Sequence, residues 1–167
     1  MTATLAISTA TPDDASAIAA VRNAAAERLT DEYGRGHWSG YTTDQGVLRG
    51  IDTSRVLVAR LAGVIVGTLR LATKKPWAID VKYFADSKRP LYLVDMAVSP
   101  ESQREGVGRQ LLEEATSVAV GWHGDAIRLD AYDHAAGAGG FYVKCGFEEV
   151  GRAIYRGVPL IYFQRLF

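Results

Sequence analysis

The sequence predicts an α/β fold built on a mixed β-sheet. Segments with the apolar, β-branched composition of strands alternate with segments whose apolar residues recur at helical spacing. Their order along the chain is strand, helices, three strands, helix, strand, helix and two strands, which is typical of helices packed on a mixed sheet. The length of 167 residues suits one core, so we expect a single domain over residues 1–167.

The N-terminal third predicts a short strand followed by helices. The strand is LAIS, residues 5–8. Thr11 can cap a helix whose first position suits Pro12, and the acidic Asp13 and Asp14 favour its positive end. Apolar residues at helical spacing carry this helix toward the stretch DEYGRGHWSGY, where we expect it to end, and residues 42–52 predict a short second helix.

Three strands are expected next, because the apolar period changes at Arg55. RVLVARL and VIVGTLRLAT flank a tight turn at Ala62-Gly63 and predict a hairpin. Residues 74–90 read as an irregular excursion. The continuously apolar LYLVDMAV, residues 91–98, predicts a strand of the kind that is usually buried on both faces.

The C-terminal part predicts a helix, a strand, a short helix and a hairpin. An apolar stripe that includes Val107 and Leu111 predicts the first helix. Residues 126–133 predict the strand. The short helix ends at Gly146, a typical glycine position just past a helix. EEVGRAIY and LIYFQRLF, joined by a turn at Arg156-Gly157, predict the hairpin.

The bulk composition argues against several classes of protein. A formal net charge of +0 gives no general attraction to nucleic acid or anionic membranes. Cys145 is the one cysteine, so no intramolecular disulfide can form. The first residues do not resemble a signal peptide, and the apolar runs are shorter than the roughly 20 residues of a membrane helix. We therefore expect a cytoplasmic protein with neither nucleic acid nor membrane as a partner.

Gly106 and Gly108 open the helix that follows the apolar strand. The first turn of a helix presents unpaired N–H groups at the positive end of its dipole, and glycine lets phosphate oxygens approach them. The alternative is that both glycines only shape a turn. The P-loop pattern does not occur in the chain, and the dinucleotide pattern fails because Leu111 stands where its third glycine belongs.

The segment from Val94 to Ala115 resembles the acetyl-CoA-binding motif of the GNAT N-acetyltransferases. Gln103-Arg104-Glu105-Gly106-Val107-Gly108 matches its [QR]-x-x-G-x-[GA] loop. Tyr142, four residues before Gly146-Phe147, matches a second signature, and the resemblance covers essentially the whole chain. It implies a mostly antiparallel mixed sheet with two splayed parallel central strands, residues 91–98 and 126–133, and helices on both faces.

The resemblance also implies acetyl-CoA as co-substrate and a set of residues that bind it. Backbone groups of residues 96–98 would hold the pantetheine arm, and the loop would hold the pyrophosphate. The cofactor-binding residues implied are Met96, Ala97, Val98, Gln103, Arg104, Glu105, Gly106, Val107, Gly108 and Arg109. Ala135 stands where the family commonly has an asparagine, so we expect Asp133 or His134 to substitute for it.

The implied reaction is direct transfer of an acetyl group to an amine, which needs a proton acceptor for the amine and a donor for the leaving thiolate. Tyr142 is the predicted donor, although it can also be a packing residue. Asp95 is the predicted base, because burial in an apolar strand would raise its pKa. The alternative for Asp95 is a carboxylate satisfied by an arginine, and Asp130 is a competing base. Cys145 is interpreted as a packing residue.

Two aromatic clusters are candidates for the acceptor pocket. Such a mixture of aromatic and polar residues is typical of small-molecule sites, although each aromatic taken singly is more often a packing residue. The candidates are His37, Trp38, Trp77, Asp80, Tyr83 and Phe84. The three histidines show no metal-ligand spacing.

We expect the acceptor to be the primary amine of a small molecule. A protein or peptide N-acetyltransferase is the first alternative, and a non-catalytic acyl-CoA-binding regulatory module is the second. A homodimer formed through the C-terminal strands is compatible with the sequence.

Overall fold

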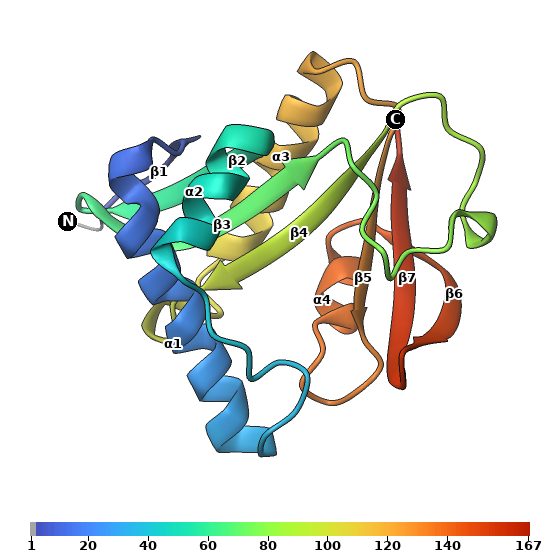
Figure 1. Ribbon diagram of the computed structural model, residues 1–167. Coiled ribbons are helices and arrows are strands. Elements are labelled where there is room, and N and C mark those ends of the chain that lie inside the picture. Colours follow the sequence, from blue (N-terminus) through green and yellow to red (C-terminus); the bar gives the residue numbers. More distant parts are fainter. Residues whose placement is uncertain (1–2) are drawn as a thin grey trace. The chain divides into compact units, whose positions relative to one another are not determined.

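The computed structural model describes residues 3–167 and contains one seven-stranded sheet, with strand order β1-β2-β3-β4-β5-β7-β6 (Figure 1). The sheet is mixed and mostly antiparallel, as predicted. The chain divides into two compact units, each described below by itself. The first holds the residues up to Leu71 and Val94–Ala115, and the second holds Ala72–Leu93 and Thr116–Phe167. The single-domain organisation stays a prediction.

The elements of the first unit begin and end close to the predicted boundaries. They are β1 (Leu5–Thr9), α1 (Ala15–Tyr33), α2 (Asp44–Thr53), β2 (Arg55–Leu61), β3 (Val64–Ala72) and the first turns of α3 (Val107–Gly121). A 3-10 turn, Pro12–Asp14, precedes α1, and the Thr11 amide donates to the Asp14 carboxylate at 2.9 Å. Ala62 and Gly63, both at positive φ, make the predicted tight turn between β2 and β3.

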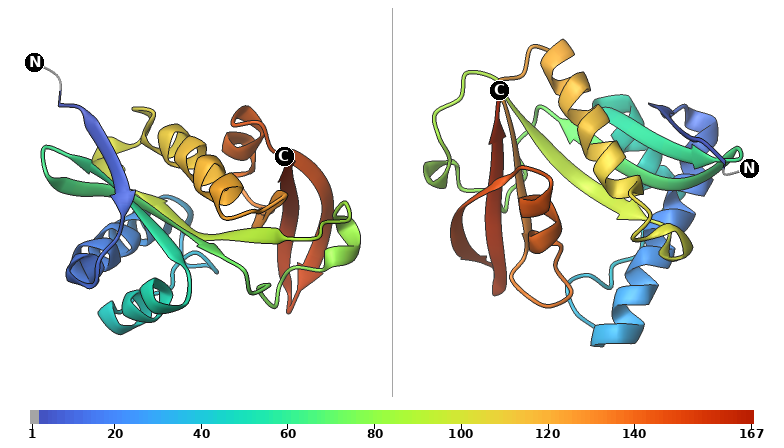
Figure 2. Two further views of the ribbon diagram at one scale, coloured as in Figure 1. Left: turned by 90° about the horizontal axis from the view of Figure 1, so that it is seen from above. Right: turned by 180° about the vertical axis from the view of Figure 1, so that it is seen from behind.

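Helices cover both faces of β2 and β3. Ile18 and Val21 of α1 and Val47 of α2 pack with Val56 and Val58 of β2 in one buried cluster. Figure 2 shows α1 and α2 on one side of these strands and the first turns of α3 on the other.

The approach of α3 to β3 depends on Gly67. A Cβ at Gly67 would lie 2.9 Å from side-chain atoms of both Val107 and Leu111, so glycine allows close packing. This contact fixes the start of α3.

The second unit is built on the C-terminal strands. Its elements are β4 (Pro90–Val98, which continues into the first unit), β5 (Ala126–Tyr132), α4 (Gly139–Lys144), β6 (Glu148–Tyr155), β7 (Val158–Leu166) and the last turns of α3. β4 and β5 pair in parallel from Pro90↔Ala126 to Tyr92↔Arg128, at the start of both strands. β5–β7 and β6–β7 are antiparallel, with the predicted turn at Arg156-Gly157.

The excursion between β3 and β4 packs against the C-terminal strands. Ile79 and Phe84 form a buried cluster with Tyr92, Leu160 and Tyr162. Arg128 donates to the Ala85 carbonyl at 2.8 Å, and the Gln164 side chain accepts from the Ala85 amide at 3.0 Å. The segment is irregular, as expected, except for a 3-10 turn at Val81–Tyr83.

The expectation that the whole of residues 91–98 is buried on both faces is wrong for the second half of this strand. Leu91, Tyr92 and Leu93 are buried, whereas Asp95 is exposed and residues 96–98 are partly exposed. Asp95 has a φ of 56°, which is outside the range of a regular strand. The backbone therefore changes direction at Asp95, where an aspartate tolerates the left-handed region better than most residues.

Candidate active site

The loop between β4 and α3 has a backbone suited to binding an anion. After the 3-10 turn Pro100–Ser102, Arg104 has a φ of 65° and Gly106 a φ of 84°. Left-handed residues that alternate with right-handed ones turn successive N–H groups toward one point and form an anion-binding concavity. The sequence indicated the special role of Gly106, but gave no sign that Arg104 would also be left-handed.

The start of α3 adds its own N–H groups to this loop. The Gln110 amide donates to the Gly106 carbonyl at 3.1 Å, so α3 begins directly after Gly106. The amides of the first helical turn, which includes Gly108, precede this bond and lie at the positive end of the helix dipole. A diphosphate is the kind of ligand that such a helix start binds.

Hydrogen bonds connect the loop to the end of β4. The Gln103 side-chain amide donates to the Val98 carbonyl at 3.1 Å, and the Ser99 amide donates to the Val66 carbonyl of β3 at 2.8 Å. Residues 96–98, expected to hold a pantetheine arm, therefore lie between the irregular residue Asp95 and the anchored loop. Ala97 also packs against the apolar cluster under α1 and α2.

Asp95 differs from the buried base that the sequence predicted. Its side chain is 33% exposed, and its two oxygens accept from Arg22 and Arg70, each at 3.0 Å. The expectation of burial was wrong because the strand is irregular at this residue. The alternative of a carboxylate satisfied by arginine describes the observed geometry, since both oxygens are already bound by guanidinium groups.

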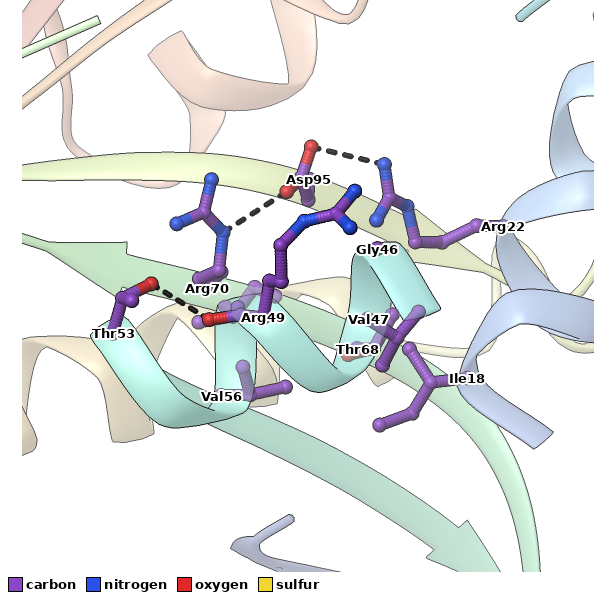
Figure 3. Close-up of a pocket in the computed structure, with 12 residues that line it drawn as sticks. Ile18, Arg22, Gly46, Val47, Arg49, Thr53, Val56, Thr68, Arg70 and Asp95 are labelled. Atoms are coloured by element: carbon purple, nitrogen blue, oxygen red, sulfur yellow. Dashed lines mark hydrogen bonds and ion pairs between the residues drawn. The ribbon is translucent and has the colours of Figure 1, made fainter. Parts of the chain in front are cut away.

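Asp95 lies at the edge of a pocket in the first unit, with a volume of about 240 Å³. Figure 3 shows Arg22 from α1, Arg49 from α2 and Arg70 from β3 around it. Sequence reasoning missed all three arginines. Arg70 carried a usable signal, because it is the one charged residue in the apolar run VIVGTLRLAT.

Tyr142 lies in the core of the second unit, on α4. Its side chain is buried, and its ring packs against Phe147 and Phe163, with ring centroids 5.9 Å apart in both cases. Burial, together with the nearby charge of Asp130, raises the pKa of the Tyr142 hydroxyl well above its usual range. The hydroxyl therefore stays protonated even in alkaline solution.

Asp130, although only partly buried, has the raised pKa that was expected for Asp95. It lies on β5 opposite Tyr162 of β7, and burial raises the pKa of its carboxyl group. Burial, with a smaller contribution from the charge of Asp130, raises the pKa values of Tyr132, Tyr142 and Tyr162. Arginines bind the Asp95 carboxylate, whereas among residues 3–167 no ion pair involves Asp130.

Asp133 lies in a second pocket together with three of the acceptor candidates. This pocket, about 930 Å³ in volume, is lined by Trp77, Asp80 and Tyr83 of the excursion and by Asp133 and Arg152. Arg152 pairs with Asp133 at 3.3 Å, and Asp80 accepts from the Lys82 amide at 3.1 Å. Asp133, which was expected to bind the cofactor, thus lines the same pocket as residues that were expected to bind the acceptor.

The remaining candidates have structural contacts. His37 and Trp38 follow α1 in the first unit, where the Trp38 indole donates to the Gly34 carbonyl at 2.9 Å. Phe84 is buried in the core of the second unit and does not line the pocket there, so its role at an acceptor site stays a prediction. Cys145 is partly buried, and its carbonyl accepts from Arg165 at 3.3 Å.

The described part of the chain holds neither a metal-binding cluster nor a membrane-spanning helix. Residues 3–167 contain no group of three or more histidine, cysteine, aspartate or glutamate side chains arranged to hold a metal ion. Over the same residues, every helix is too short or too polar to cross a membrane.

A mixed sheet in which a glycine-containing anion loop joins a central strand to a helix is the architecture of acyl-CoA-dependent acyltransferases. The profile of the acetyltransferase (GNAT) domain matches residues 52–149, which is more than half of the chain. The protein therefore belongs to the GNAT acetyltransferase family. A search of curated proteins gives no significant match.

Solved structures with low sequence identity share the fold. YncA from Salmonella typhimurium, solved with its cofactor acetyl-CoA, is 18% identical at a TM-score of 0.73, with 97% of this chain and 93% of that chain covered. PaiA N-acetyltransferase from Thermoplasma acidophilum, solved with coenzyme A, is 15% identical and has a TM-score of 0.73. The match covers 98% of this chain and 99% of that chain. Ribosomal-protein-alanine N-acetyltransferase from Brucella melitensis is 20% identical and has a TM-score of 0.71. The match covers 97% of this chain and 99% of that chain.

Proposed function

We propose that this protein is an N-acetyltransferase that moves an acetyl group from acetyl-CoA directly to the primary amine of a small molecule. The observation that carries the proposal is the loop before α3, where Arg104 and Gly106 are left-handed and the helix begins directly afterwards. Such a loop binds a diphosphate, which coenzyme A contains. The YncA and PaiA structures, which hold acetyl-CoA and coenzyme A, support this assignment.

In this proposal the chain binds the co-substrate through main-chain groups. Residues 103–109 hold the pyrophosphate, and Met96, Ala97 and Val98 bind the pantetheine arm. Gln103 supports both regions, because its side chain is already bonded to the Val98 carbonyl. Arg104 and Arg109 add positive charge beside the loop.

The proposed reaction forms a C–N bond and breaks the C–S bond of the thioester. The neutral amine attacks the thioester carbonyl, the amine proton passes to a base, and the thiolate leaves. We assign the base to Asp130, because it lies on β5 opposite Tyr162 with no ion pair among the described residues, and because burial raises its pKa. Tyr142, protonated at neutral pH, donates to the departing thiolate.

A small acceptor is favoured by the size of the pocket beside Asp95. Its 240 Å³ lies just below the roughly 300–1,000 Å³ of sites for drug-sized ligands. A protein acceptor, which the name of the Brucella enzyme implies for that relative, would instead need an open cleft. Acetylation of free small amines at rates at least equal to those of peptides with the same N-terminal residue would support the proposal.

Thermal unfolding with and without acetyl-CoA tests the co-substrate. A ligand at 100 times its Kd stabilises the folded state by about 2.7 kcal/mol. For a chain of this size we expect Tm to rise by about 5–10 °C. Coenzyme A and desulfo-CoA serve as comparisons, because they share the diphosphate and lack the thioester. An unchanged Tm at millimolar acetyl-CoA would remove the basis of the proposal.

A pair of glycine variants tests the loop itself. Gly106→Leu places a side chain where the diphosphate would contact the main chain, and we expect it to abolish the Tm shift. Gly63→Leu is the matched control, because Gly63 has a similar φ of 80° and, like Gly106, lies clear of tight contacts. Both variants carry the same backbone strain, so only Gly106→Leu should lose acetyl-CoA binding.

A further inference from the structure

We propose that the acceptor carries an oxyanion, a carboxylate or phosphonate, in addition to its amine, and that Arg22, Arg49 and Arg70 bind this group. The inference rests on the proposed acetyl transfer and narrows its substrate class. It is carried by the charge and the contacts of the pocket beside Asp95.

The pocket holds more positive than negative charge. Three arginines line it, and Asp95 is the one acidic residue among the described residues that do so. Like-charged groups this close repel one another unless an anion lies between them. Asp95 supplies one negative charge and leaves a net charge of +2 for a ligand to balance.

The two arginines that bind Asp95 keep further donors. A guanidinium has five N–H groups. Asp95 accepts one N–H from Arg22 and one from Arg70, and Arg70 also approaches the Ser54 hydroxyl at 3.4 Å. The carboxylate thus fixes the orientation of both guanidinium groups while leaving them able to bind a second anion.

Arg49 is the arginine without an ion pair in this pocket. Among residues 3–167, no ion pair or side-chain hydrogen bond of Arg49 is found, although its carbonyl accepts from Thr53 at 2.7 Å. Figure 3 shows its side chain extending from α2 to the same side as Arg22 and Arg70. An unpaired guanidinium beside two others suits a carboxylate or phosphonate, which arginine can bind through two parallel hydrogen bonds.

The position of the pocket fits an acceptor site. Asp95 directly precedes Met96–Val98, the segment assigned above to the pantetheine arm. The walls come from α1, α2, β3 and β4, so an anchored acceptor would lie beside that segment. The volume of about 240 Å³ suits a molecule of amino-acid size.

Matched acceptors that differ in charge test the inference. We would measure kcat/KM for α- and ω-amino acids, each beside its own amide, and for 2-aminoethylphosphonate beside β-alanine. We expect at least one acid to exceed its amide by about tenfold or more. Comparing kcat/KM for 2-aminoethylphosphonate with that for β-alanine shows whether the site prefers a phosphonate or a carboxylate. The inference is wrong if every amide has a kcat/KM as high as that of the matching acid. It is also wrong if an amine that carries no anionic group reacts as well as the acids do.

Arg49→Gln should lower the acid-to-amide ratio of kcat/KM by about tenfold, chiefly through KM. Taking the ratio cancels differences in amine basicity. Arg28→Gln is the matched control, because it removes the same charge from an exposed position of α1, where Arg28 pairs with Glu32 at 3.9 Å and acts electrostatically on Glu101. We expect Arg28→Gln to keep the wild-type ratio. An unchanged ratio in Arg49→Gln would overturn the role of Arg49.

Binding without acetyl-CoA separates this inference from the proposed function. We would titrate the protein with 2-aminoethylphosphonate and with β-alaninamide, and follow thermal unfolding. Stabilisation by the phosphonate that Arg49→Gln removes would support the anion site even if acetyl-CoA does not bind. If acetyl-CoA binds and no oxyanion-bearing amine binds or reacts, the inference fails and the proposed function stands.

Discussion

Asp95 and Asp130 lie on neighbouring strands of the sheet, yet their surroundings differ. Asp95 on β4 is one-third exposed, and each of its oxygens accepts from an arginine at 3.0 Å. Asp130 on β5 has no ion pair among the described residues, and burial raises its pKa. Both oxygens of Asp95 are engaged by guanidinium groups, whereas desolvation raises the affinity of the Asp130 carboxylate for a proton.

This difference separates two functions that the sequence could not distinguish. Each aspartate is an isolated acid in an apolar strand. The arginines near Asp95 come from α1 and β3, far away in sequence, so only the fold brings them to it. We therefore assign Asp95 to the organisation of the acceptor pocket and Asp130 to proton transfer. Each prediction below can confirm or reverse this assignment.

The largest effect is expected for Asp130→Asn. The amide cannot accept the amine proton, so kcat should fall by about 100- to 10,000-fold, the usual contribution of a general base. The change is nearly isosteric, and acetyl-CoA should still raise Tm as in the wild type. Release of free CoA thiol under single-turnover conditions measures the chemical step.

Asp31→Asn is the control for Asp130→Asn, because Asp31 is exposed on α1 and has no recorded ion pair among the described residues. It should keep the wild-type kcat. An Asp130→Asn protein that reacts at the wild-type rate would exclude this residue as the base.

Tyr142→Phe should lower kcat by a smaller factor. It removes the hydroxyl but keeps the ring that packs on Phe147 and Phe163. A hydrogen bond to a developing thiolate accounts for a loss of about 10- to 100-fold in kcat. KM for acetyl-CoA should change little, because the interaction forms as the thiolate develops. A lower Tm with an unchanged single-turnover rate would show that Tyr142 is a packing residue.

The pH dependence of stability gives a test that needs no substrate. The pKa of Asp130 is raised in the folded state, so folding favours its protonated form. The wild type therefore loses stability as pH rises from the ordinary carboxyl pKa through the raised one, whereas Asp130→Asn does not. We expect the variant to have the higher Tm at neutral pH, and the difference to vanish in acid. A lower Tm for the variant at neutral pH would contradict the unpaired, desolvated state of Asp130.

The sequence predicted the elements of the fold well because their signals are local. Strand and helix periodicity, the capping residues Thr11 and Pro12, and the turns at Ala62-Gly63 and Arg156-Gly157 all act within a few residues. The left-handed turn at Gly106 was predictable for the same reason, since this glycine directly precedes α3. The left-handed Arg104 was not, because arginine has no preference for that conformation.

The environment of the aspartates could not be predicted, because it depends on contacts between distant segments. The apolar composition of residues 91–98 predicted that the whole segment is buried. The structure shows that burial stops before Asp95, where the backbone is left-handed. Arg22 and Arg49 occur in helical segments where a charged residue usually faces solvent. Only the packing of α1 and α2 beside β3 places them in one pocket with Arg70.

The smallest effect is expected for Asp95→Asn, and it should fall on stability. Asparagine tolerates the left-handed backbone at this position nearly as well as aspartate, so the change removes charge without adding strain. Partly exposed ion pairs contribute about 1 kcal/mol, which lowers Tm by roughly 2–4 °C at this size. Repulsion among the three arginines adds to the loss, and salt should reduce the difference because it screens both interactions.

Kinetics of Asp95→Asn complete the comparison with Asp130→Asn. We expect kcat to fall less than tenfold, and KM for the acceptor to change because Arg22 and Arg70 lose their shared carboxylate. The opposite result, a loss of kcat as large as that of Asp130→Asn with an unchanged Tm, would make Asp95 the base despite its arginines. In that case the guanidinium groups would have to release the carboxylate when an oxyanion-bearing acceptor binds them, and KM would then depend on the same two arginines.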